Sequence, residues 1–390
     1  MAGTVLSGSS GIVTQELEAF GWAKPTRLRQ ALSRTMGDGY AAARSVFRLA
    51  RGAELWAPFP LRHRLTSWVH GFSAQNAAMY ERTSRDFARG DRSAFLTDYA
   101  RRYRCAGLNP ERSHLDKKLV LRALLMTRGI AQPETVALIA SGYAQLHPLS
   151  ADARYVDGRE LENWLIADGG RFVLKPNDGC RGRDVFLLEV RDGTLVCRRG
   201  RESRPFRPAD CGPVSLIERF VEQGTFWREL CPFSANTMRV ITMWTPGDAA
   251  PFLAWASQRI GTVDTAPTDN WSGGGVGAAI DLASGRLGLG HLHPLKYPRA
   301  QSTCTHHPSS GIRIEGAVIP HWDRVRETVL RAAASLPLNR YVGWDVLVDT
   351  RGTPVIIEGN ANTDIGGLQV HGGLLADRRI RRFYERCGVI

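Results

Sequence analysis

The segment that most constrains the fold is a predicted β-hairpin at residues 341–360. It consists of two apolar, strand-like runs separated by Arg351–Gly352, which is typical of a tight turn. A symmetric turn at Arg351–Gly352 would place Asp345 directly opposite Glu358. Asn360 follows Glu358 by two residues, and side chains alternate between the faces of a strand. The hairpin is therefore predicted to carry three oxygen-bearing side chains on one face.

Two carboxylates that face each other across a hairpin repel, so they need a cation or an arginine between them. Mg²⁺ prefers oxygen ligands and often shares them with nucleotide phosphates. Asp345, Glu358 and Asn360 are therefore predicted magnesium ligands. The alternative is an ordinary solvated hairpin with surface acids, and the motifs upstream argue against it.

A second informative segment is the strand-like run Phe172–Pro176 and the glycine-containing loop after it. Gly179 and Gly182 allow the backbone to approach phosphates closely, and Lys175 at the strand end can place its ammonium group against a phosphate oxygen. Alone, this pattern is weak, because most glycine hairpins that carry a lysine are simply turns. The chain has neither a GxxxxGK[ST] loop nor a GxGxxG between a strand and a helix, which argues against P-loop and Rossmann sites.

Apolar periodicity divides the chain into a helical first part and a strand-rich remainder. Spacings of three and four residues predict helices up to about residue 115, a helix over 113–127 and a short helix at 133–140. Arg122 lies on the apolar stripe of the second of these. From Arg171 onward, short β-rich runs separated by turn residues predict antiparallel sheets and an α+β class.

Composition indicates a globular protein with an expected cytoplasmic location and no membrane partner. With 43% hydrophobic residues, the chain still lacks an apolar run of roughly 20 residues, and its start lacks the order of a secretory signal. Its seven cysteines include no close pair, so we expect reduced thiols. The formal charge of +13 comes from arginines spread along the chain without a nucleic-acid motif, so nucleic-acid binding is not expected.

The order of lysine, glycine loop, acidic strand, arginine and D-x12-E-x-N hairpin resembles the ATP-grasp superfamily over roughly residues 113–370. The sugar-transfer-associated ATP-grasp group is more similar still, through the motifs Ser234-Ala-Asn-Thr-Met-Arg239, Gln258-Arg-Ile-Gly-Thr-Val-Asp, Asp269-Asn270, Gly273-Gly274, Gly343-Trp-Asp345 and Glu358-Gly-Asn360. This resemblance implies an α+β ATP-grasp fold, two lobes clasping ATP, preceded by a mostly helical region. The implied domains are the helical region at 1–112, a first lobe with the phosphate loop at 113–214 and a C-terminal lobe with the metal hairpin at 215–390.

The resemblance also implies a cofactor pair, ATP and Mg²⁺, and a set of ATP ligands. Those ligands are Lys118, Lys175, Gly179, Gly182, Glu218, Val221 and Glu222. The lysines and glycines would meet the phosphates, backbone groups near Glu218 and Val221 would hold adenine, and Glu222 would reach the ribose. Lys117 is the alternative to Lys118, and Glu229 is the alternative to Glu222.

Such a site supports attack of a carboxylate on the γ-phosphate of ATP to form an acyl phosphate, from which an amine displaces phosphate. Arg239 and Arg259 are the expected catalytic residues, since a guanidinium group matches two phosphoryl oxygens at once. An ordinary arginine at a strand end is the alternative for Arg259. The glycine-rich loop at 262–277 is the expected substrate segment, with a surface excursion as the alternative. The predicted substrate ligands are Asn236, Asp269, Asn270 and Gly274.

The resulting hypothesis is a carboxylate–amine ligase acting on small-molecule, peptide or sugar-conjugate substrates. The alternatives are a phosphotransferase on the same scaffold and a nucleotide-binding module without turnover. His291 and His293 alternate on a possible strand, and His306 and His307 form a second pair, but neither pair has a third ligand at metal-site spacing. We therefore expect no metal site at these histidines. The sequence does not indicate an oligomeric state.

Overall fold

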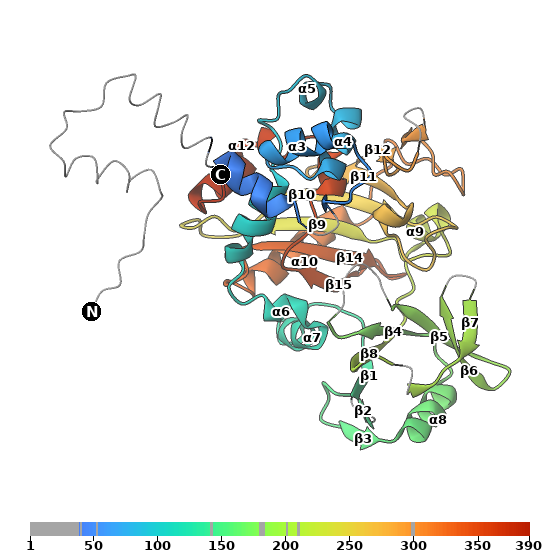
Figure 1. Cartoon of the computed structure of the whole chain (residues 1–390). Helices are drawn as coiled ribbons and strands as arrows, with labels where there is room; N and C mark the ends of the chain where they lie inside the picture. Colours follow the sequence, from blue (N-terminus) through green and yellow to red (C-terminus); the bar gives the residue numbers. More distant parts are fainter. Residues whose placement is uncertain are drawn as a thin grey trace, which may run out of the picture. The chain divides into compact units, whose positions relative to one another are not determined.

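The computed structural model describes residues 39, 41–51, 54–140, 143–178, 184–199, 202–208, 211–297 and 301–390. The chain forms two compact units. One comprises Met1–Ala77 with Thr97–Tyr99, and the other comprises Ala78–Leu96 with Ala100–Ile390. Helices expected before residue 39 lie outside the described residues. The second unit contains both β-sheets, and Figure 1 shows them in green and in yellow to red.

The first part of the chain is helical, as predicted. Its elements are α3 (Leu61–Val69), α4 (Ala74–Thr83), α5 (Arg85–Ala88), η2 (Ala100–Arg104) and η3 (Cys105–Leu108). In the first unit, Asp98 is buried and its carboxylate accepts from the backbone N–H of Ser73 at 2.7 Å and from the Asn76 amide at 2.7 Å. A buried acid satisfied in this way fixes the start of α4.

The first sheet has eight strands in the order β3-β2-β1-β8-β4-β5-β6-β7, and all neighbours are antiparallel. The strands are β1 (Thr135–Ala140), β2 (Tyr143–Leu146), β3 (Arg154–Val156), β4 (Phe172–Pro176), β5 (Phe186–Arg191), β6 (Thr194–Arg199), β7 (Glu202–Pro205) and β8 (Val214–Arg219). Leu161 and Leu165 of helix α8 (Gly158–Asp168) pack in its core. The expected lobe boundary at 214/215 coincides with the start of β8, which lies in the middle of this sheet.

One predicted helix is wrong: residues 133–140 contain strand β1 instead. The run Thr-Val-Ala-Leu-Ile-Ala is mostly buried and carries two β-branched aliphatic residues, and periodicity alone does not separate such a run from a buried helix. The helix predicted over 113–127 is also interrupted. It forms α6 (Ser113–Asp116) and α7 (Lys118–Met126), because Lys117 between them is extended.

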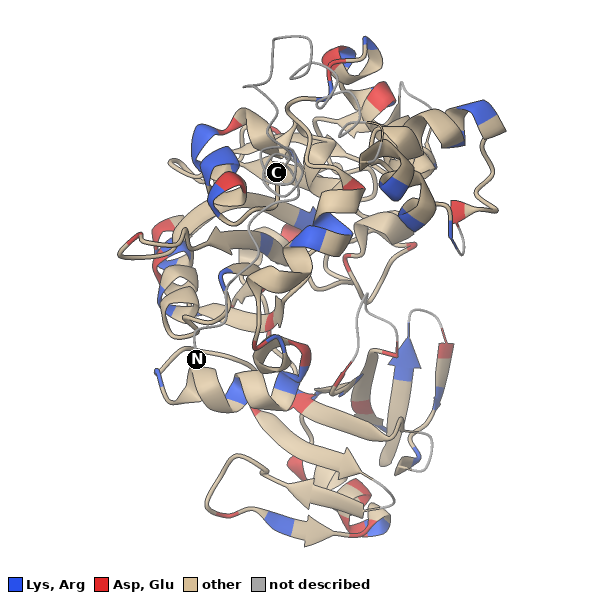
Figure 2. Cartoon of the chain, turned by 60° about the vertical axis from the view of Figure 1, so that its left-hand side comes forward, with Lys and Arg blue, Asp and Glu red and all other residues tan. Residues whose placement is uncertain are grey.

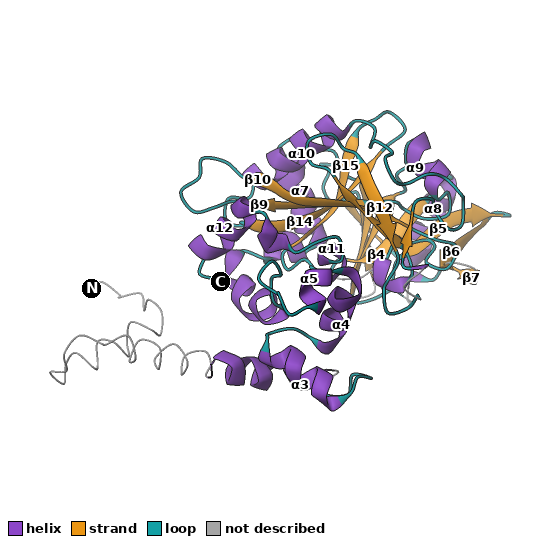
Figure 3. Ribbon diagram, turned by 90° about the horizontal axis from the view of Figure 1, so that it is seen from above, coloured by secondary structure: helices purple, strands orange, loops and turns teal. Residues whose placement is uncertain are grey.

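The second sheet has seven antiparallel strands in the order β13-β12-β11-β10-β9-β14-β15. They are β9 (Met238–Met243), β10 (Phe252–Ile260), β11 (Val276–Ile280), β12 (Leu287–His291), β13 (Thr303–Cys304), β14 (Tyr341–Val348) and β15 (Pro354–Asn360). The remaining helices are α9 (Thr225–Leu230), η5 (Trp271–Gly273), α10 (Trp322–Ala334), α11 (Gly366–Gln369), η7 (Leu374–Ala376) and α12 (Arg378–Arg386). Figure 3 shows these helices against the strands.

Alternation along the strands gives the second sheet two buried faces. Val240, Trp344 and Val346 pack on one face in the cluster that includes apolar residues of α7 and α10. Ile241 and Tyr341 pack on the opposite face in the cluster that includes α12. Arg239 and Asp345 are two or four residues from Ile241 and Tyr341 on the same strands, so they share the second face. Every residue of β14 is buried, which makes a charged residue there costly unless it is paired.

The predicted hairpin is formed by β14 and β15, with one difference in register. Near the turn Val346 pairs with Ile356, so the pairing there is offset by one residue from the symmetric arrangement. A one-residue bulge at Ile357 corrects the offset, and beyond it Asp345 pairs with Glu358. The predicted pairing is confirmed, but the bulge rather than a symmetric turn produces it.

Candidate active site

Three adjacent strands of the second sheet place charged side chains in one row. Asp345 in β14 is directly opposite Arg239 in β9 and Glu358 in β15. Residues opposite one another across a sheet project to the same face. Asn360 is two residues beyond Glu358 and shares that face. The hairpin and the arginine strand, far apart in the sequence, therefore form one polar row.

Asp345 is held by two arginines. The Nε and Nη2 groups of Arg239 donate to its two carboxylate oxygens at 2.5 and 3.0 Å, and Nη2 of Arg259 donates at 3.0 Å. Burial alone would raise the pKa of Asp345, which is 3% exposed, but the charges of Arg239 and Arg259 outweigh burial and hold that pKa well below its usual range. Asp345 is therefore a carboxylate that fixes both predicted catalytic arginines.

Arg259 has a second acidic partner, Asp269, at 3.3 Å. The Asp269 carboxylate also accepts from the backbone N–H of Thr237 at 2.7 Å and from the Thr237 hydroxyl at 2.5 Å. Burial raises the pKa of Asp269, with the charge of Arg259 acting against it. Asp269, predicted as a substrate ligand, is thus placed as the support of Arg259.

Glu358 and Asn360 complete the row. Asn360 donates from Nδ2 to the Gly343 carbonyl at 3.2 Å and, more weakly, to Glu358 Oε1 at 3.4 Å. Burial and the neighbouring Asp345 charge raise the pKa of Glu358, while the charge of Lys118 acts to lower it. Two adjacent carboxyl groups whose pKa values are shifted in opposite directions repel when both are charged, and a cation between them would relieve that repulsion. The donor set, two carboxyls and one amide, fits Mg²⁺.

The predicted phosphate lysine Lys175 lies in a buried charge cluster. Its Nζ is 2.5 Å from Glu218, and Glu218 also pairs with Nε of Arg122 at 2.9 Å. Burial lowers the pKa of Lys175 to about 8 against the attraction of Glu218. The charges of Arg122 and Lys175 overcome the effect of burial and lower the pKa of Glu218. The side chain of Glu218 is therefore the counter-ion of both cations.

Arg122 also contacts the β14–β15 hairpin at its bulge. Its Nη1 donates to the Ile356 carbonyl at 3.1 Å and its Nη2 to the Ile357 carbonyl at 2.5 Å. One fully buried guanidinium group thus joins Glu218 of the first sheet to the strand that carries Glu358. Arg122 had no predicted functional role, although an arginine on an apolar helix stripe indicates a buried partner.

The two candidate lysines at the start of α7 differ in environment. Lys118 is 6% exposed, and its charge affects the pKa values of both Lys175 and Glu358. Lys117 is exposed and pairs with Asp178. Asn177 holds the start of α7, because its backbone carbonyl and side-chain oxygen accept from the N–H groups of residues 118 and 119. The geometry favours Lys118.

The adenine and ribose candidates lie at and after the end of β8. Val221 is partly buried, whereas Glu222 is exposed and pairs with Arg171. Glu229, the alternative acid, is also exposed and lies in α9. Gly179 and Gly182 of the phosphate loop lie outside the described residues. The structure leaves both ribose candidates open.

The remaining predicted substrate residues organise the loop before β11. Asn236 is fully buried, and its amide donates to the carbonyls of Trp227 and Cys231 at 2.9 and 2.8 Å. Asn270 accepts from the Ser272 backbone N–H at 3.2 Å and caps η5. Gly274 has φ of 129°, which other residues rarely adopt. These contacts support a structural role for the three residues.

Thr363 belongs to the site although the sequence did not indicate it. Its hydroxyl accepts from Nη1 of Arg239 at 2.7 Å. A Cβ atom at Gly343 would lie 2.5 Å from that hydroxyl and 3.2 Å from Cδ of Arg239. The glycine of the Gly-Trp-Asp motif thus provides the space that Arg239 and Thr363 occupy.

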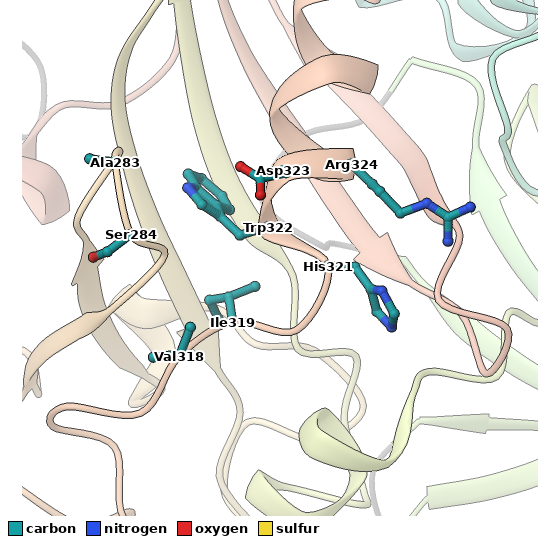
Figure 4. A pocket seen from close by; sticks show the side chains of 8 residues that line it. All are labelled: Ala283, Ser284, Val318, Ile319, His321, Trp322, Asp323 and Arg324. Atoms are coloured by element: carbon teal, nitrogen blue, oxygen red, sulfur yellow. The ribbon is translucent and has the colours of Figure 1, made fainter.

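A separate cavity of about 360 Å³ lies at the start of α10 (Figure 4). It is lined by residues 283–284, 318–319 and 321–324, and none of the predicted site residues is among them. Figure 2 shows Lys and Arg on many separate helices, strands and loops. Within the described residues, no helix is long and apolar enough to cross a membrane, and no three His, Cys, Asp or Glu side chains form a metal cluster.

The structure has two antiparallel sheets. The first carries a buried lysine near the end of β4, and the second carries a hairpin with two carboxyl groups and an amide. These features together define an ATP-grasp protein. The chain matches the model of the sugar-transfer associated ATP-grasp family over residues 97–383, and it belongs to that family. The resemblance inferred from the motifs is confirmed. No curated protein matches the chain.

Several solved structures are similar to parts of this chain at low sequence identity. N5-carboxyaminoimidazole ribonucleotide synthetase from Thermotoga maritima is 12% identical, with 64% of this chain and 42% of that chain covered and a TM-score of 0.34. L-amino acid ligase from Bacillus licheniformis is 12% identical, with coverage of 66% and 42% and a TM-score of 0.33. A Chryseobacterium gregarium RiPP-associated ATP-grasp ligase is 10% identical, with coverage of 71% and 61% and a TM-score of 0.36. The chain spans less than two thirds of the length of each.

Proposed function

We propose that the protein is an ATP-dependent carboxylate–amine ligase that forms an amide through an acyl phosphate. The observation that carries this proposal is the row of Arg259, Arg239, Asp345 and Glu358 on one face of the second sheet. Cationic side chains at one end of the row and acidic side chains at the other suit a phosphoryl group passing from ATP to a carboxylate. No covalent nucleophile is needed.

The nucleotide end of the proposed site contains Lys175 and Lys118. Both ammonium groups are buried, which disfavours their charged form, and a phosphate beside them would supply the negative charge that stabilises it. Backbone groups near Glu218 and Val221 would hold the adenine, with Glu222 or Glu229 at the ribose. Because the side chain of Glu218 already pairs with Lys175, its contribution to adenine binding is assigned to its backbone.

Asp345, Glu358 and Asn360 would hold Mg²⁺, which when bound offsets the charge of the phosphate oxygens. Burial and the Asp345 charge raise the pKa of Glu358, and the charge of the ion would stabilise its carboxylate form. Asp345 already carries a negative charge that Arg239 and Arg259 compensate. The three side chains thus need no change of strand or register to form the ligand set.

Arg239 and Arg259 would orient the transferring phosphoryl group and the carboxylate that receives it. Both guanidinium groups are anchored, by Thr363 in one case and by Thr237 and Asp269 in the other. Anchored donors need little reorganisation as charge develops on the phosphoryl oxygens. The expected substrates are a small-molecule, peptide or sugar-conjugate carboxylate and an amine.

The test incubates the protein with ATP, Mg²⁺, a panel of carboxylic acids and hydroxylamine, and measures ADP and hydroxamate. Formation of both with at least one acid supports the ligase, and Asp345→Asn should reduce it at least 100-fold, within the range seen when a catalytic electrostatic contact is removed. Asp323→Asn, on the exposed start of α10, is the matched control and should remain active. A stable phosphorylated product would instead indicate a phosphotransferase. ATP binding without ADP formation for any acid would indicate a nucleotide-binding module.

A further inference from the structure

Beyond Arg259, the same face of the second sheet ends in a histidine that the proposed chemistry leaves unassigned. His291 closes β12 opposite Gly277 of β11, and Gly277 is opposite Arg259 of β10. Such cross-strand neighbours project to one face. His291 therefore lies two strands from Arg259, roughly 10 Å at the usual strand spacing, on the side away from Glu358.

A second histidine, His371, packs against it from the segment after α11. The two rings are 4.4 Å apart between centroids at 70°. His371 lies over Gly277: a Cβ atom at position 277 would be in ordinary contact with His371 Nε2 at 3.7 Å and in close contact with Trp271 at 3.3 Å. The Trp271 indole N–H donates to the His291 carbonyl at 2.8 Å. The predicted substrate loop and the segment that provides Thr363 thus meet at this pair.

Each ring has a buried nitrogen without a partner. Nδ1 of His291 and Nε2 of His371 make no hydrogen bond to any residue that the structure describes. Buried polar atoms are rarely left unsatisfied, and those that are require an explanation such as a ligand. Burial lowers the pKa of His291, and burial together with His291 lowers that of His371 to about 3. Both imidazoles are therefore neutral near pH 7, with one nitrogen each able to accept a hydrogen bond.

We propose that His291 and His371 bind the amine substrate, accepting hydrogen bonds from its N–H groups on the side of Arg259 that faces away from Glu358. This inference rests on the proposed ligase function and assigns its second substrate site. The ligand is a primary amine in its neutral, nucleophilic form, because the pair offers acceptors and no negative charge. Trp271, in the single turn η5, lies beside the pair and would help to separate the bound amine from water, which would otherwise hydrolyse the acyl phosphate.

The kinetic test separates the two substrates. Hydroxylamine at saturating concentration traps the acyl phosphate and reports the first half-reaction, and primary amines (an alkylamine, an amino alcohol, an amino acid and an amino sugar) report the second. His371→Phe and His291→Phe fill the same space without an acceptor. We expect hydroxamate formation within twofold of wild type and a KM for the amine at least tenfold higher.

Conservative variants and a control keep the result specific. His371→Gln and His291→Asn retain an acceptor near the original nitrogen and should keep the amine KM within about threefold, a rescue that a purely structural role would not show. His306→Phe, at an exposed position, should leave both rates unchanged. An unchanged amine KM in both phenylalanine variants, or an equal loss of hydroxamate and amide, would overturn the assignment.

A second measurement does not depend on turnover. The same primary amines are titrated into the full chain labelled with ¹⁵N-histidine, with resonances assigned from the single variants. Shifts at Nδ1 of His291 and Nε2 of His371, without shifts at His306, support the site. No shift at either nitrogen with any amine overturns it. Absence of hydroxamate in the wild-type protein would count against the ligase proposal alone.

Discussion

Replacing Arg122 with methionine should destabilise the protein strongly. Arg122 is 1% exposed and donates to Glu218 at 2.9 and 3.3 Å, as well as to two carbonyls at the bulge of β15. Removing one partner of a buried ion pair costs about 3–5 kcal/mol. Lys175 would still neutralise Glu218, so we expect a loss near the lower end, about 3 kcal/mol.

The assay is denaturant unfolding followed by tryptophan fluorescence, with Arg112→Met as the matched control. Arg112 pairs with Asp116 at 2.9 Å on the surface of the neighbouring helix, and an exposed pair at this spacing contributes about 0.3–0.5 kcal/mol. A loss below about 1 kcal/mol for Arg122→Met, or equal losses in the two variants, would refute the reasoning that one buried guanidinium joins the two sheets.

Three further predictions follow from local contacts. Gly343→Ala should reduce ADP formation at least tenfold while the chain still folds, because the added Cβ atom meets the Thr363 hydroxyl at 2.5 Å; wild-type activity would contradict this. Without ATP, the free energy of unfolding of wild type relative to Lys175→Met should rise by about 3 kcal/mol between pH 8 and 10.5. The pKa of Lys175 is about 8 in the folded protein and 10.5 in the unfolded chain, so the unfolded chain binds more protons in this range. Parallel pH profiles of the two proteins would exclude this explanation. Asp157→Ala should cost about 1 kcal/mol in a thermal melt, because Asp157 caps α8 by accepting from the Glu160 N–H at 2.8 Å, and Asp157→Asn should restore most of the loss.

The local features of the site were predictable from the sequence because they are properties of single elements. The turn at Arg351–Gly352 and strand alternation predicted that Asp345, Glu358 and Asn360 share one face, and the structure has that arrangement through a bulge at Ile357 that was not predicted. The strand β4 with Lys175 was likewise identified from its apolar run. Short-range periodicity and turn chemistry carry this information.

The contacts between elements were not predictable in the same way. Nothing near Asp269 in the sequence indicates that its partner is Arg259, because that pair depends on how a loop returns to its own sheet. The run at 133–140 is a strand because it pairs with the neighbouring β2 and β8, and its own residues do not carry that information. Pairing with neighbouring strands decides whether such a segment forms a strand or a helix.

The bulge at Ile357 determines which side chains of the second hairpin strand face the candidate site. Successive side chains of a strand point to alternate faces of the sheet, and the extra residue of a bulge shifts this alternation by one position. If the strand continued from Ile356 without a bulge, strict alternation would instead turn Glu358 and Asn360 to the face occupied by Val346. The face to which Glu358 and Asn360 point therefore depends on the bulge at Ile357 as much as on the identity of the residues in the strand.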